Sequence, residues 1–180
     1  MPTVLTHAVV AGAAVKALSK EDKQLRLWLT AVALSVLPDA DVIGFYFGVR
    51  YGDFFGHRGF FHSPFFALIL SVFCVAILFR NCRPFSWDWY KLVAFFFALG
   101  SSHGLLDAMT DGGLGIALLS PFNNARYFFG WAPIPVSPIG AAGFRTPRGL
   151  QVITWEVLFL WIPLLITLGA ILTARRFRQR

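Results

Sequence analysis

The sequence predicts an all-α protein, a polytopic membrane bundle of about five apolar helices, some of them kinked or re-entrant. Three observations lead to this prediction. Of the 180 residues, 57% are hydrophobic and only 14% are charged, whereas a soluble domain has about 25% charged residues. Several apolar runs approach the roughly 20 residues that a helix needs to cross the hydrocarbon core. Prolines and glycines interrupt particular apolar runs, which predicts the kinks. Residues 1–180 are predicted to form a single domain.

Five apolar segments cover most of the chain. The first is short and rich in alanine, which favours packing against other helices over contact with lipid. The second reaches a Leu-Pro-Asp-Ala-Asp sequence, where the proline is expected to kink or end the helix. The third and fifth are predicted to be plain spanning helices. The segments are Val4–Leu18, Leu27–Phe47, Gly59–Phe79, Leu92–Leu119 and Val152–Ala174.

The fourth segment and the stretch that follows it are expected to be irregular. The fourth is too long for one simple span and is rich in glycine, so its second half is predicted to unwind or to re-enter the membrane. Residues 122–150 are rich in proline and are predicted to form an irregular outer loop.

Basic residues predict the orientation of the bundle. In the five-span arrangement, 11 Lys and Arg residues fall at one end and 5 at the other. Cytoplasmic segments of membrane proteins carry the excess of Lys and Arg. We therefore predict a multi-pass protein of the bacterial inner membrane with a cytoplasmic C-terminus. The net charge of +7 is then explained by the Lys and Arg residues that set the membrane orientation. No nucleic-acid partner is therefore expected. The expected partner is the lipid bilayer.

All four histidines and several aspartates lie within or beside the apolar segments. An aspartate at membrane depth costs roughly 2.5 to 3.5 kcal/mol, so such residues are functional candidates. In the predicted topology, the histidines and these aspartates gather near the outer ends of the helices. A divalent metal ion is the simplest device that would offset their desolvation.

The strongest motif is Ser-Ser-His-Gly-Leu-Leu-Asp, residues 101–107, because His103 and Asp107 are four residues apart and share a helical face. Asp39 and Asp41 flank the expected kink. Imidazole and carboxylate ligands without thiolate favour zinc, manganese or iron, and leave room for a bound water. An ion that lowers the pKa of this water would promote hydrolysis.

Asp41 and Arg58 are the predicted catalytic residues. Asp41 can act as a general base when it is not a ligand, or it can cap a helix. Arg58 lies beside His57 and offers a bidentate fork suited to phosphate, or it can pair with a neighbouring aspartate. Both alternatives remain open from the sequence.

Four blocks of residues together carry a family resemblance. They are His7 in the first helix, Asp39-Ala-Asp41, His57 to Ser63, and Ser102 to Asp107. They resemble the YdjM/YbcI-like family of inner-membrane metal-dependent hydrolases, described as LexA-regulated in some bacteria, over essentially the whole chain. That family is distantly similar to zinc-dependent phospholipase C, an all-helical fold that binds several zinc ions. The resemblance implies a ligand set of His7, Asp39, His62 or His57, His103 and Asp107.

The phospholipase has later His and Glu ligands, which have no clear counterpart here. No histidine follows His103, and Glu156 is the only late acidic candidate. The resemblance and the motifs together predict a hydrolase in which metal-activated water attacks a phosphoester of a lipid or lipid-linked substrate at the outer face. A non-catalytic regulator or scaffold with a structural metal is an alternative. An ion transporter is another, although few acids or histidines continue into the inner halves of the segments.

Overall fold

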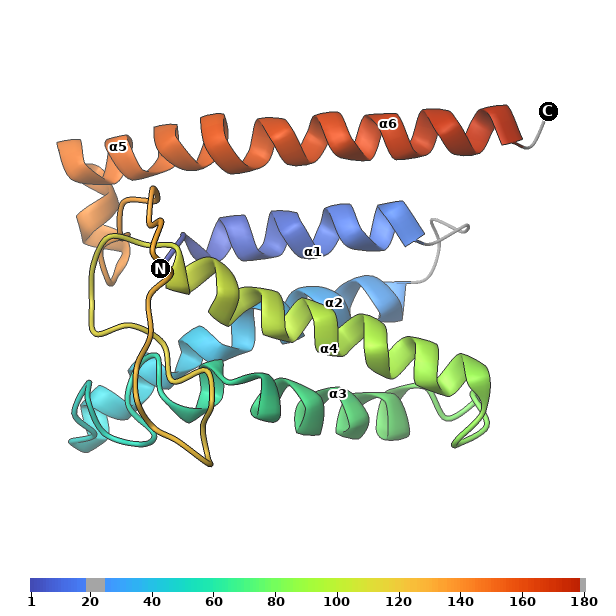
Figure 1. The fold of residues 1–180 in the computed structure, drawn as a ribbon, viewed down its shortest axis with the longest axis horizontal. Helices are drawn as coiled ribbons and strands as arrows, with labels where there is room; N and C mark the ends of the chain where they lie inside the picture. The colour runs from blue at the N-terminus through green and yellow to red at the C-terminus, as the bar shows by residue number, and fades with distance from the viewer. Residues whose placement is uncertain (19–24, 179–180) are drawn as a thin grey trace.

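The computed structural model describes residues 1–18 and 25–178, and these residues form helices joined by loops (Figure 1). The only β-contacts in this part of the chain are two isolated bridges, Thr110 with Ile134 and Ile116 with Tyr127. The helices are α1 (Val4–Leu18), α2 (Leu25–Val36), the 3₁₀ helices η1 (Leu37–Phe47) and η2 (Phe60–His62), α3 (Pro64–Leu78), α4 (Trp87–Ala108), the 3₁₀ helix η3 (Ala141–Arg145), α5 (Pro147–Glu156), the π-helix η4 (Val157–Trp161) and α6 (Ile162–Arg178). The all-α prediction is confirmed.

The long helices lie side by side, and the chain reverses direction between them (Figure 1). The closest packing joins α3 with α4, α1 with α2, and α2 with α4, while α6 lies along the outer side of α1. One end of the bundle is built from residues 37–63 and 109–146, and we call it the loop end. The opposite end, where α1, α3 and α6 finish, is called the basic end.

The basic end carries most of the cations, as the sequence predicted for one end of the bundle. The described ones are Lys16, Arg26, Arg80, Arg83, Lys91, Arg175, Arg176 and Arg178. Arg26 Nη1 donates to the Leu78 carbonyl at 2.7 Å, which ties the start of α2 to the end of α3. Lys20, Lys23 and Arg180, counted at the same end, lie outside the described residues. Which side of the membrane this end faces stays a prediction.

Hydroxyl side chains and prolines fix where the loop-to-helix transitions occur. Ser63, Ser86 and Thr146 precede α3, α4 and α5, and their oxygens accept hydrogen bonds from backbone N–H groups three residues later, at 3.1, 3.3 and 3.2 Å. Pro64 and Pro147 occupy the first helical positions, where the missing N–H costs nothing. The helices therefore begin at Pro64 and Pro147, and not at the predicted residues Gly59 and Val152.

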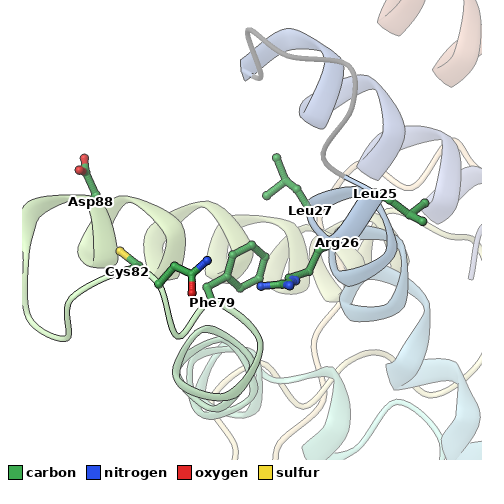
Figure 2. A pocket seen from close by; sticks show the side chains of 7 residues that line it. Leu25, Arg26, Leu27, Phe79, Cys82 and Asp88 are labelled. Atoms are coloured by element: carbon green, nitrogen blue, oxygen red, sulfur yellow. The ribbon is translucent and has the colours of Figure 1, made fainter.

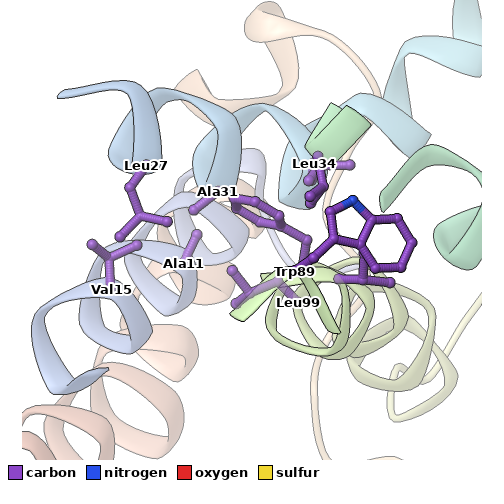
Figure 3. Packing of buried hydrophobic residues seen from close by; sticks show 10 residues of the cluster. Ala11, Val15, Leu27, Ala31, Leu34, Trp89 and Leu99 are labelled. Atoms are coloured by element: carbon purple, nitrogen blue, oxygen red, sulfur yellow. The ribbon is translucent and has the colours of Figure 1, made fainter. Parts of the chain in front are cut away.

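The hydrophobic core lies between α1, α2, α3 and α4. Small residues on α1 and α2, such as Ala11 and Ala31, have no exposed surface and allow these helices to approach closely (Figure 3). Larger side chains from α4, including Trp89, Phe96 and Leu99, fill the space beside them. This packing holds α4 against the N-terminal helices.

Within residues 1–18 and 25–178, two continuous helices are long and apolar enough to cross a membrane, Leu25–Phe47 and Pro147–Arg178. Residues Ile162–Arg178 include no buried residue. Leu165 and Ile166 are 55% and 67% exposed, and an apolar surface of this kind marks a contact with a membrane or with another protein. The helices Val4–Leu18 and Pro64–Leu78 are apolar but shorter. The five-span count is therefore not confirmed.

The irregular regions of the structure begin and end at other residues than the sequence predicted. η1 is a 3₁₀ helix with Pro38 near its start and Gly48 (φ +81°) after its end, so the chain does change course after Val36. The fourth segment is helical only to Ala108, and the residues after it are irregular, with positive φ at Gly113 and Gly115. The predicted irregular loop of 122–150 is too long, because η3 and α5 begin within it.

A cavity of about 680 Å³ opens at the basic end (Figure 2). Its lining combines the start of α2 with the α3–α4 connection and the first turn of α4, and includes Arg26, Phe79, Cys82 and Asp88. None of the four histidines lines it, so this cavity is separate from the polar residues of the loop end.

Candidate metal centre

Four buried side chains from η1, η2 and α4 meet at the loop end. They are Asp39, His62, His103 and Asp107, and one ligand atom from each lies within 4.8 Å of the others. The distances from Asp39 Oδ1 to His103 Nε2 and His62 Nε2 are 3.4 and 3.6 Å. From Asp107 Oδ2 to His62 Nε2 and His103 Nε2 they are 3.5 and 3.8 Å. We call these residues the four-residue group.

These distances fit an ion better than they fit hydrogen bonds. They exceed the range of about 2.7 to 3.2 Å that is usual for N–H···O bonds. Two ligands that each lie about 2.1 Å from one ion, in a tetrahedral arrangement, are about 3.4 Å apart. The observed separations of 3.4 to 3.8 Å are close to that value. The four-residue group therefore has the spacing of a metal site.

The ligand atoms also make no hydrogen bond within the described part of the chain. Both oxygens of Asp39 and of Asp107, both ring nitrogens of His62, and His103 Nε2 are buried without a hydrogen bond. A buried carboxylate without a donor costs several kcal/mol, by order of magnitude. Arg58 Nε, 3.8 Å from Asp107 Oδ2, offsets part of this charge, and an ion between the two carboxylates would offset more of it. The donor set of two imidazoles and two carboxylates suits zinc, manganese or iron.

His7 lies beside the four-residue group. Its Nε2 is 3.4 Å from Asp107 Oδ1, whereas His62 and His103 approach the other oxygen of that carboxylate. The His7 ring also stacks on the His103 ring, with centroids 3.9 Å apart. Both ring nitrogens of His7 lack a hydrogen bond to a described residue. The structure thus brings His7 next to Asp107, and the role of His7 as a ligand stays a prediction.

Further contacts orient the two imidazoles. His103 Nδ1 donates to the Ser35 carbonyl at 2.8 Å, which leaves Nε2 to face the carboxylates. His62 Nδ1 lies 3.3 Å from Asp41 Oδ2. Metal-bound histidines usually have such a partner on the nitrogen that does not bind the ion. Asp41 and the Ser35 carbonyl occupy this position here.

Asp41 joins His62 to His57. Its Oδ1 lies 2.7 Å from His57 Nδ1, and its Oδ2 accepts from the Arg58 backbone N–H at 3.2 Å. Asp41, His57 and His62 form a second cluster whose ligand atoms lie within 4.8 Å. The structure therefore places His62 in both clusters and His57 only in the second. Of the two histidines, His62 is the one that the four-residue group contains.

Arg58 is buried at 1% exposure and contacts protein acceptors. Its Nη1 donates to the Gly112 carbonyl at 2.6 Å and its Nη2 to Thr110 Oγ1 at 3.0 Å. Its Nε lies 3.8 Å from Asp107 Oδ2. Of the two roles that the sequence allows for Arg58, these contacts favour pairing with an aspartate.

Gly104 allows η2 to reach α4. A Cβ at this position would overlap with the His62 carbonyl oxygen, so any other residue would push His62 away from His103. The glycine in the Ser-Ser-His-Gly motif therefore serves close approach and not helix breaking. No local sequence pattern indicates this role, because the neighbour of Gly104 lies 42 residues earlier in the chain.

An arginine from the loop after α4 covers the second cluster. Arg126 Nη1 donates to the His57 carbonyl at 2.8 Å and Nη2 to the Tyr51 carbonyl at 3.0 Å. Burial raises the pKa of the Tyr51 phenol above its ordinary value, against the lowering effect of Arg58 and Arg126. Tyr51 therefore stays neutral at pH 7 and packs edge-on against His57, with ring centroids 5.2 Å apart.

Glu156, the late acidic candidate, lies elsewhere. Its carboxylate accepts hydrogen bonds from the Thr3 N–H at 2.6 Å, from Thr3 Oγ1 at 2.5 Å and from Thr6 Oγ1 at 2.6 Å. Trp161 Nε1 donates to Thr6 Oγ1 at 2.7 Å. Glu156 thus ties α5 to the start of α1 and is not part of either candidate ligand cluster.

Fold and site together define a class of helical protein that has helices long and apolar enough to cross a membrane and a buried group that can hold a divalent metal. A family model described as YdjM inner membrane protein matches residues 1–177. The chain is also 39% identical, over 176 residues, to the inner membrane protein YbcI of Escherichia coli (strain K12), an alignment that covers 98% of this chain and 100% of that one. The chain therefore belongs to the YdjM family of inner membrane proteins, which confirms the predicted family and supports the inner-membrane location. No solved structure matches it.

Proposed function

We propose that this protein is a membrane-bound hydrolase that cleaves a phosphoester of a lipid or lipid-linked molecule with the help of a divalent metal, zinc being favoured over manganese or iron. The observation that carries the proposal is the four-residue group, in which two buried carboxylates and two imidazoles face one another without hydrogen bonds. A metal ion bound there would supply Lewis acidity and would lower the pKa of a water molecule.

The residues of the chain have distinct roles in this proposal. Asp39, His62, His103 and Asp107 hold the ion, and His7 is a further donor next to Asp107. Asp41 stays the proposed general base, and it also accepts from His57 on one oxygen and faces His62 with the other. Arg58 acts as a positioning residue, since its guanidinium holds Thr110 and Gly112 and balances the charge of Asp107.

An assay of lipid hydrolysis tests the proposal. Purified protein in nanodiscs would be loaded with zinc, manganese or iron(II) and given phosphomonoester and phosphodiester lipids, with release of phosphate or headgroup as the readout. We expect metal-dependent product, and a loss of about 100-fold or more in His103→Ala, because removing a ligand costs more than the about 10- to 100-fold lost with a residue that only orients a ligand. Asp88→Asn, at an exposed position of the basic end, should match wild type. Absence of product from metal-loaded wild type across this panel would refute the hydrolase.

A structural metal in a non-catalytic regulator or scaffold is the second candidate. The depth of the site favours it, since the side chains of His62, His103 and Asp107 are 0% exposed and that of Asp39 is 5% exposed, and structural metal sites are closed to water. In that case the metal-loaded protein would be more stable than the metal-free protein and would release no product.

A further inference from the structure

A groove on the outside of the bundle leads to Asp39. It has a volume of about 460 Å³ and is formed by α2 and η1 together with Val4 of α1. Seven of its eight lining residues are apolar, and Asp39 is the eighth. Its size lies within the range of about 300 to 1,000 Å³ that is usual for sites of small molecules.

The walls of the groove belong to a helix that can cross a membrane. Leu29, Val36 and Ala40 line it, and all three lie within Leu25–Phe47, one of the two helices long and apolar enough to span the bilayer. Where such a helix crosses the bilayer, its surroundings are hydrocarbon over about 30 Å. An apolar groove that opens toward hydrocarbon can hold either water or an alkyl chain. The alkyl chain is favoured, because apolar walls offer water no hydrogen bonds.

Asp39 connects the groove to the four-residue group. Its side chain is 5% exposed, whereas those of His62, His103 and Asp107 are 0% exposed. Its Oδ1 lies 3.4 Å from His103 Nε2. A molecule that occupies the groove therefore contacts Asp39 as well as the seven apolar side chains, while the buried carboxylate oxygens of Asp39 face the four-residue group.

We propose that the groove binds an alkyl chain of a membrane lipid, which enters sideways from the bilayer and brings its ester group next to Asp39. The lining contains no Lys or Arg that would select a free phosphate or a headgroup without its chain. This inference rests on the proposed function and deepens it, because it assigns the recognition of the substrate to its chain.

Ala33 offers a way to fill the groove without disturbing the core. It lines the groove and is exposed, so Ala33→Trp occupies the space where the chain would lie, and Ala33→Leu occupies part of it. Ala76 on α3 is also exposed but does not line the groove, so Ala76→Trp is the matched control.

The test uses phosphatidic acid with a photoactivatable diazirine in one acyl chain, incorporated in nanodiscs with the full-length protein. Peptide mapping should place adducts on residues 29–40. These should fall by about 10-fold in Ala33→Trp, which corresponds to about 1.4 kcal/mol of binding, by less in Ala33→Leu, and not at all in Ala76→Trp. Metal content and thermal unfolding, measured on the same samples, establish that each variant is folded.

The outcomes separate this inference from the proposed hydrolase. Labelling of the groove that Ala33→Trp removes supports the groove, even if no lipid is hydrolysed and the hydrolase is refuted. Labelling spread evenly over the exposed apolar helices, and unchanged in Ala33→Trp and Ala33→Leu, overturns the groove, even if hydrolysis is observed. Loss of long-chain hydrolysis in Ala33→Trp, with a short-chain soluble phosphoester still cleaved, supports both.

Discussion

Two clusters of buried polar residues lie near the start of α1, and they are built in opposite ways. Glu156 is 1% exposed and accepts three hydrogen bonds from Thr3 and Thr6, at 2.5 to 2.6 Å. Asp39 and Asp107 are similarly buried, yet neither carboxylate has a hydrogen-bond donor among the described residues. Burial alone therefore does not distinguish them. The presence or absence of donors does.

The difference shows how a structural acid can be told from a ligand. A buried carboxylate with a full set of donors is compensated by the protein and holds elements together. A pair of buried carboxylates without hydrogen-bond donors, facing two imidazoles, gains further compensation when a cation binds. Glu156 thus fastens α5 to α1, whereas the four-residue group is arranged for an ion.

Removing the metal should produce the largest effect. An ion present at about 1,000 times its Kd stabilises the folded state by about 4.1 kcal/mol. At about 2 to 4 °C per kcal/mol, chelation should lower the unfolding midpoint by about 8 to 16 °C. Differential scanning fluorimetry with and without a chelator, followed by addition of zinc, measures the change. A midpoint that chelation leaves unaltered argues that the four-residue group holds no ion.

Glu156→Ala should destabilise the protein and leave the metal in place. The substitution leaves the donors of Thr3 and Thr6 without their acceptor, which costs about 3 kcal/mol in total if water reaches some of them. The unfolding midpoint should fall by about 6 to 12 °C. Elemental analysis should find the metal content of wild type. A loss of metal in this variant would mean that the four-residue group depends on the contacts of Glu156.

Gly104→Ala should damage the four-residue group through its backbone. The new Cβ would overlap with the His62 carbonyl oxygen, and overpacking of this kind costs about 1 to 3 kcal/mol. We expect weaker metal binding together with a lower unfolding midpoint. Gly130→Ala is the matched control, because a Cβ there meets nothing within 4 Å. Equal metal affinity in the two variants would show that His62 can move without loss of the site.

Asp41→Asn should have the smallest effect of these changes. Asparagine keeps the shape of the side chain but removes the charge that faces His62 Nδ1 at 3.3 Å. Loss of a residue that orients a ligand lowers metal affinity by about 10- to 100-fold. Competition with a fluorescent zinc chelator measures this affinity, and Asp53→Asn on the neighbouring loop serves as the comparison. A complete loss of metal would instead make Asp41 a ligand.

Much of the fold and part of the site follow from the sequence. Apolar runs predicted the helices, and the spacing of His103 and Asp107 predicted that both side chains lie on one face of α4. Asp39 and His62 were placed near them because the chain reverses at the same end of the bundle. These are consequences of periodicity and of short connections, which a single sequence contains.

Other features depend on contacts that no local pattern records. Ser35 orients His103 through its backbone carbonyl, and a carbonyl is the same in every residue. Gly104 is needed because of the His62 backbone, which only the tertiary structure brings near. His57 and His62 share one motif, and the fold decides that His62 joins Asp39 and Asp107.

Elemental analysis of detergent-purified protein tests most directly whether the four-residue group is a metal centre. Wild type, His103→Ala, Asp107→Ala and Glu156→Gln would be measured side by side, with folding checked by circular dichroism. We predict that wild type and Glu156→Gln carry a stoichiometric divalent metal and that folded His103→Ala and Asp107→Ala do not. Wild-type protein that remains metal-free after exposure to zinc, manganese and iron(II) would contradict a metal centre, because the carboxylates of Asp39 and Asp107 would then have to be compensated without an ion.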